Sequence, residues 1–230
     1  MAIAFDAFAV GATGTTNRSW THTPVGTPRA ALAVILNLNG ENPSTAATYG
    51  GVAMTKAAGA PVVKATGEVG AVDIWFLGAN VPTGAQTVEI TVNGSGTKAP
   101  RSYTLTAGTD TYVVDTAAFN SDSLENPSDT LALGGIVSWA MVAFLSGQDD
   151  VTGITPLANW TADNEADPGT VTAGCYRYDT VAGTDITAGW TQAAEDAIGL
   201  AVAVAERRPT HALPAVGGGG LVGPLRHSIG

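Results

Sequence analysis

Short runs in which apolar and polar residues alternate indicate β-strands along most of this chain. In 86–92 (QTVEITV), the valines and Ile90 fall on one face of an extended backbone and polar residues on the other, as in a strand with one buried face. The run 197–206 (AIGLAVAVAE) has large aliphatic residues on one face and Ala or Gly on the other. This favours a sandwich strand, with an alanine-rich helix as the alternative. The run 136–145 is apolar on both faces and predicts a central strand or a buried helix.

Gly, Pro, Asn and Asp separate these runs, whose number and spacing predict an all-β chain. We expect an antiparallel β-sandwich with a jelly-roll-like arrangement of strands. No clean domain boundary occurs before residue 206, so we expect one sandwich domain over 1–206. The segment 116–131 is the best place for a short helix or a long loop. The expected strands are 3–9, 18–23, 30–38, 52–56, 72–78, 86–93, 101–106, 111–115, 134–146, 170–178, 185–191 and 197–206.

The composition fits a chain that buries a core and does not bind polyanions. Of 230 residues, 45% are hydrophobic and only 13% are charged, against about 25% charged residues in an average soluble domain. The formal net charge is −10. This argues against non-specific binding of nucleic acid and against an anionic membrane surface, because both need clustered Lys and Arg.

The segment 207–230 (RRPTHALPAVGGGGLVGPLRHSIG) differs from the rest, because it holds three of the ten basic residues and none of the 20 acidic ones. Ordering a residue costs about 1–2 kcal/mol of backbone entropy, and the four consecutive glycines offer no side chains for contacts. We therefore expect an extended tail that docks on a partner subunit; the alternative is that it folds back on its own body. The expected contact residues are Arg207, Arg208, Leu213, Leu221, Val222, Leu225, Arg226 and Ile229.

The single cysteine, Cys175, excludes an internal disulfide and is expected to be a small core residue or a surface thiol, not a nucleophile. The N-terminal residues MAIAFDAF show neither the basic region nor the apolar run of a signal peptide. We therefore expect synthesis in a cytoplasm, followed by incorporation into a particle; an extracellular surface is the alternative location.

No catalytic constellation is recognisable, and we expect a protein that is not an enzyme and needs no cofactor. The three histidines are His22, His211 and His227, without a convincing Ser-His-Asp order, and the zinc motifs H-E-x-x-H and C-x-x-C are missing. His22, between two threonines, is expected to be a half-exposed strand residue.

Two weaker binding hypotheses concern the second half of the chain. Asp163, Glu165 and Asp167 supply carboxylates on a loop, the ligand type that calcium favours, although solvated loop charge is the simpler interpretation. Four aromatic residues would stack on a host-surface glycan if they were exposed, with core packing as the alternative. These residues are Trp160, Tyr176, Tyr178 and Trp190.

Several segments carry a resemblance to a known family. They are IAFDAF (3–8), SWTHT (19–23), RAALAVILNLN (29–39), TYGGVAMTK (48–56), VDIWFLGANVPTGAQTVEITVNG (72–94), VAFLSGQDDVTGITPL (142–157) and AGTDITAGWTQAAEDAIGLAVAVAE (182–206). On these residues the chain resembles a β-sandwich domain family of uncharacterised phage virion and bacterial surface proteins. The resemblance implies a jelly-roll-like sandwich in a virion or cell-surface setting, and it supplies no catalytic residues.

These observations favour a non-enzymatic structural protein of a phage-like particle, either a capsid decoration or a tail component. The expected partners are other copies of the chain or other virion proteins, bound through 207–230. A host-surface glycan-binding module and an extracellular filament subunit are the alternatives.

Overall fold

The computed structural model describes residues 3–38, 43–64, 70–94, 96–147, 153–166 and 171–207. Within these ranges all regular structure is β-strand, which confirms the predicted all-β sandwich. None of the described ranges forms a helix of the length and hydrophobicity that a bilayer-spanning segment requires.

In the first half of the chain, the strands pair in a nested order. The antiparallel pairs are β1 (Ala4–Val10) with β10 (Thr97–Thr106), β2 (Arg18–His22) with β9 (Gln86–Val92), β3 (Pro28–Leu38) with β8 (Gly70–Leu77), and β4 (Ser44–Tyr49) with β5 (Val52–Ala53). The short strands β6 (Thr55–Lys56) and β7 (Val62–Lys64) add to β8. Pairing first with last and second with second-last winds a long hairpin into a jelly roll. Its larger sheet has the order β1-β10-β3-β8-β6, and its smaller sheet β2-β9-β4-β5.

The second half repeats this topology. The pairs are β11 (Thr111–Leu124) with β18 (Glu195–Glu206), β12 (Ser128–Leu131) with β17 (Ile186–Thr191), and β13 (Val137–Ser146) with β16 (Thr172–Ala182). Strand β15 (Thr161–Ala166) adds to β16, and β14 (Thr155–Pro156) adds to β17. The larger sheet is β11-β18-β13-β16-β15 and the smaller is β12-β17-β14. The expected 1–206 body thus contains two jelly-roll units in tandem, which we call the first and second units.

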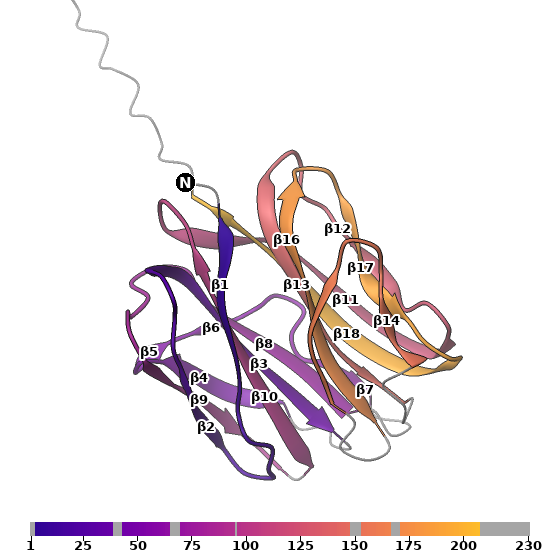
Figure 1. Cartoon of the computed structure of the whole chain (residues 1–230). Coiled ribbons are helices and arrows are strands. Elements are labelled where there is room, and N and C mark those ends of the chain that lie inside the picture. Colours follow the sequence, from indigo (N-terminus) through magenta and orange to yellow (C-terminus); the bar gives the residue numbers. More distant parts are fainter. Residues whose placement is uncertain are drawn as a thin grey trace, which may run out of the picture.

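The two units pack through their larger sheets (Figure 1). One apolar core lies between these sheets and takes residues from both, such as Leu32 and Val34 from β3 and Met141 from β13. Cys175 on β16 belongs to this core, as predicted. Burial raises the pKa of its thiol to about 11, so this thiol stays protonated and unreactive at neutral pH.

The smaller sheets cover the outer faces of the larger ones and enclose two further cores. This arrangement explains the small-residue face of β18, which is not exposed but receives aromatic rings. Phe144 on β13 has Gly174 and Gly199 as its two cross-strand neighbours. A Cβ atom at Gly199 would lie 2.3 Å from the ring of Phe119. The two phenylalanine rings therefore occupy space that is free because the neighbouring residues are glycines.

Every strand expected from the sequence overlaps an observed strand, although the single strand expected at 52–56 is two short strands, β5 and β6, in different sheets. The helix alternatives for 136–145 and 197–206 are excluded. The expectation of a helix or loop over 116–131 is wrong, because β11 continues to Leu124 and β12 follows at Ser128–Leu131. Strand β11 lies at the edge of its sheet. An edge strand needs fewer apolar residues than a central one, so the polar residues of 116–124 concealed it. Strands β4, β7, β14 and β15 were not anticipated either.

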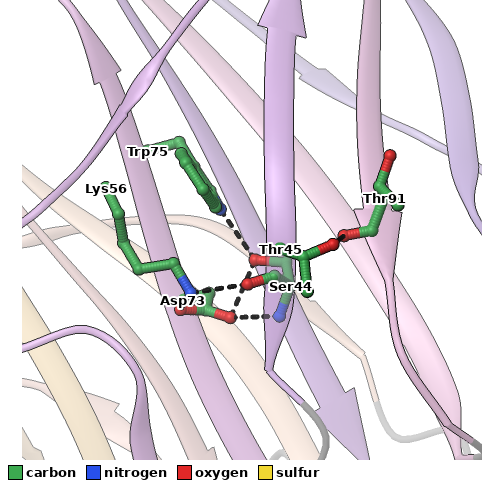
Figure 2. Close-up of polar contacts among 6 residues, drawn as sticks. All are labelled: Ser44, Thr45, Lys56, Asp73, Trp75 and Thr91. Carbon is green, nitrogen blue, oxygen red and sulfur yellow. Dashed lines mark hydrogen bonds and ion pairs between the residues drawn. The ribbon is translucent and has the colours of Figure 1, made fainter.

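A buried carboxylate, Asp73, joins the two sheets of the first unit through its contacts with Lys56 and Ser44 (Figure 2). Asp73 on β8 is buried, and its Oδ2 accepts hydrogen bonds from the backbone N–H of Ser44 (2.6 Å) and from its hydroxyl (2.8 Å). The ammonium of Lys56 lies 3.0 Å from the other oxygen, Oδ1, and donates to the Ser44 carbonyl at 2.6 Å. The indole of Trp75 donates to Ser44 Oγ at 2.7 Å. A single carboxylate therefore fixes β4, β6 and β8 relative to one another.

The prediction that His22 is half-exposed is wrong, because its side chain is fully buried between the sheets of the first unit. Its Nδ1 lies 2.7 Å from Ser102 Oγ and its Nε2 lies 3.0 Å from Thr104 Oγ1. Thr104 in turn donates to Asp6 Oδ2 at 2.8 Å, so the Thr104 oxygen is left to accept a hydrogen bond from Nε2–H. The imidazole is therefore neutral with its proton on Nε2, and burial lowers its pKa to about 4.

We expect this histidine to make the fold sensitive to mild acid. Because the folded state holds the pKa of His22 below its unfolded value of 6.5, the stabilisation is present above pH 6.5 and is lost as the pH falls toward 4. Between pH 7 and pH 5 the free energy of unfolding should fall by about 2 kcal/mol through this group. Urea unfolding at both pH values, compared with His22→Gln, measures the effect. An equal acid-induced loss in the variant would contradict it.

Candidate partner-binding groove

A groove of about 870 Å³ lies between the two units, along one edge of their larger sheets. Its walls are β5, β6 and the end of β8 from the first unit, and the first half of β11 from the second. Its lining residues are Val52, Thr55, Lys56, Ala57, Ala58, Phe76, Leu77, Gly78, Ala79, Asn80, Asp110, Thr111, Tyr112, Val113, Val114, Asp115, Thr116 and Arg207.

Both walls of this groove are open sheet edges. Strands β6 and β11 are the outermost strands of their sheets, and no other described strand pairs with their free sides. The ladder between β11 and β18 is interrupted between Val113 and Asp115, which leaves Val114 as a bulge. Bulges are frequent at sheet edges and beside binding sites. The N–H and C=O groups on a free edge are available to an added strand.

One end of the groove is held rigidly by Thr111. Its backbone N–H donates to the Gly78 carbonyl at 2.8 Å, and its hydroxyl donates to the Arg29 carbonyl at 3.0 Å. These bonds tie the start of β11 to the first unit and fix the width of the groove at that point.

Arg207, the last described residue, lies at the same end. Its backbone N–H donates to the Asp110 carbonyl at 2.7 Å, and its own carbonyl accepts a bond from the Thr109 hydroxyl at 2.7 Å. Its guanidinium lies 5.9 Å from the centre of the Tyr112 ring. The chain therefore leaves the described structure from the wall of the groove.

Acidic and apolar groups share the lining. Lys56 is already paired with Asp73, so its charge is neutralised within the first unit. Asp110 is exposed, and Asp115 is half-buried with one oxygen accepting the N–H of Ala132 at 2.6 Å. Phe76 and Val113 are half-buried. With Lys56 paired, the two carboxylates outnumber the one guanidinium of the lining, that of Arg207. Such a lining suits a basic, partly apolar segment in an extended conformation.

Of the residues expected to bind a partner, the structure places only Arg207. The others lie outside the described residues, namely Arg208, Leu213, Leu221, Val222, Leu225, Arg226 and Ile229. The histidines His211 and His227 lie outside them as well.

The structure does not support the glycan-binding surface, since the four rings pack within the second unit. Trp190 and Tyr176 are fully buried, and Trp160 is 6% exposed. The Trp160 indole donates to the Thr187 carbonyl at 3.0 Å and meets the half-buried ring of Tyr178 edge to face, with ring centres 5.6 Å apart. Core packing, the alternative interpretation, is the one the structure supports.

The carboxylates expected to bind calcium have other partners. Asp163 forms an ion pair with Arg177, and Glu165 accepts a hydrogen bond from the Tyr176 hydroxyl. Asp167 lies outside the described residues. Within the described part of the chain, no group of three or more His, Cys, Asp or Glu side chains could hold a metal ion.

Comparison with known proteins gave no match to a family model, a curated protein or a solved structure. The resemblance to phage virion and surface domains therefore stays a prediction.

The groove could not be located from the sequence. Its residues come from three separated stretches and Arg207, and they meet only because the two larger sheets stack with their edges aligned. The basic tail that begins at 207 predicted a partner surface, but not its location.

Proposed function

We propose that this chain is a non-enzymatic structural subunit of a phage-like particle, a capsid decoration or tail component, that assembles through its C-terminal segment. The groove carries the proposal: the open edges of two stacked sheets line it where the described chain ends. A surface of this kind is suited to receiving an extended segment from another protein.

Two further features support a structural role. Jelly rolls are recurrent building blocks of viral capsids, although they also occur in lectins; a fold alone does not define a function. The chain packs two such units through a common core, which makes a stiff body. Its proposed setting is the virion, and its proposed partners are other copies of itself or other virion proteins.

The proposal predicts that removal of residues 208–230 abolishes assembly without unfolding the body. Light scattering should give a defined oligomer or polymer for the full chain and a monomer for a variant that ends at Arg207. Circular dichroism and thermal unfolding show whether the shortened variant remains folded.

A full-length companion variant separates the loss of apolar contacts from the removal of the residues themselves. In it, five apolar residues are changed to Ser: Leu213, Leu221, Val222, Leu225 and Ile229. It should also be monomeric. The same number of subunits in the particles of the intact and shortened chains would refute assembly through this segment.

A further inference from the structure

We propose that the groove receives residues 208–230 of a neighbouring copy, which add to the free edge of β11 as an extended strand. This inference rests on the proposed function and names the surface that the segment binds. Strand addition needs an unpaired edge and pockets for alternate side chains. The β11 edge supplies the unpaired backbone groups, and the half-buried groups of the lining supply the pockets.

The chemistry of the segment matches that of the groove. Residues 208–230 contain two arginines, no acid and several aliphatic residues. The groove offers the carboxylates of Asp110 and Asp115 beside apolar groups such as Phe76 and Val113. The body carries all 20 acidic residues of the chain, so its wider field attracts a basic segment from outside.

The position of Arg207 favours exchange between copies over self-occupation. Its N–H and C=O are both bonded at the end of the β11–β18 pair, so the chain would have to reverse immediately afterwards to enter its own groove. Arg208 precedes a proline, and a residue before proline favours extended backbone. Twenty-three extended residues span at most roughly 80 Å, a reach that includes an adjoining subunit.

Cross-linking in the full chain tests this assignment. One population carries Thr116→Cys in the groove, and a second, with a different affinity tag, carries Leu213→Cys. A bismaleimide should join the two into a species that contains both tags. The native Cys175 is buried with a raised pKa, so the reagent should spare it.

The matched control replaces Thr116→Cys by Val25→Cys, which is 88% exposed and lies outside the groove. Mixed-tag product at the level of this control would overturn the assignment. Cross-linking only within one chain, in a Thr116→Cys/Leu213→Cys double variant, would show that the segment occupies its own groove and would also overturn it.

A second variant blocks the groove without altering the segment. Ala58 is exposed and lines the groove, so Ala58→Trp should abolish most of the mixed-tag product; Ala12→Trp, exposed and outside the groove, should not. Full product with Ala58→Trp would count against the groove. Assembly without cross-linking would refute only the groove, whereas monomeric full-length chain in light scattering would refute the proposed function as well.

Discussion

Replacement of Trp190 by alanine is expected to lower the free energy of unfolding by about 3–5 kcal/mol. The side chain is fully buried, stacks on Phe144 with ring centres 4.3 Å apart, and lies 5.3 Å from the ring of Phe119. Its indole donates to Gln192 Oε1 at 2.7 Å. Removing the ring leaves a cavity between the sheets of the second unit and takes the indole donor away from Gln192 Oε1.

Urea unfolding followed by circular dichroism measures this loss. Trp190→Phe is the matched control, since it keeps an aromatic ring over Phe144 and loses chiefly the indole hydrogen bond, at a cost of about 1 kcal/mol plus a smaller packing loss. A change within about 0.5 kcal/mol for Trp190→Ala, the range of ordinary surface substitutions, would show that this ring is not part of a core.

Replacement of Asp73 by alanine should lower the free energy of unfolding by about 3 kcal/mol, the lower end of the range for breaking a buried ion pair. The variant leaves the N–H and hydroxyl of Ser44 without their acceptor and Lys56 without its counter-ion. The loss is moderated because the Lys56 side chain is 24% exposed and can turn its ammonium toward water.

A double-mutant cycle with Asp73→Asn and Lys56→Met isolates the ion pair from the hydrogen bonds to Ser44. Because asparagine retains an acceptor for Ser44, the double variant should be more stable than Asp73→Ala. If the two substitutions were additive, the carboxylate and the ammonium would not interact in the folded protein.

Most of the long strands could be predicted from sequence because they have a local pattern of apolar and polar residues. The alternation in 86–92 and the two-faced pattern of 197–206 are properties of neighbouring residues. The part of β11 over 116–124 was not predicted as a strand. Because β11 is an edge strand, and one of its sides pairs with no other strand in the described structure, its sequence is not constrained to be apolar. Local patterns do not indicate partners, and the pairing of β1 with β10 joins residues nearly one hundred positions apart.

The burial of polar residues could not be predicted from the sequence either. His22 is flanked by Thr21 and Thr23, which is typical of a wet strand face. It is buried because Ser102 and Thr104, some eighty residues later, supply its hydrogen bonds. Similarly, the sequence does not show that Trp190 on β17 and Tyr176 on β16 pack in one core between the smaller and larger sheets of the second unit.

The shared core has a consequence for synthesis of the chain. The first unit is complete once β10 has emerged at Thr106, whereas the second needs β18, which ends at Glu206. At translation rates of about 5–20 residues per second, the delay is roughly 5–20 s. During that time the first unit displays residues such as Leu32, Val34 and Ile74 without their cover. The nascent chain therefore passes through a stage at which the first unit exposes apolar surface. A chaperone, or ribosomes spaced widely along the message, would protect this surface from aggregation.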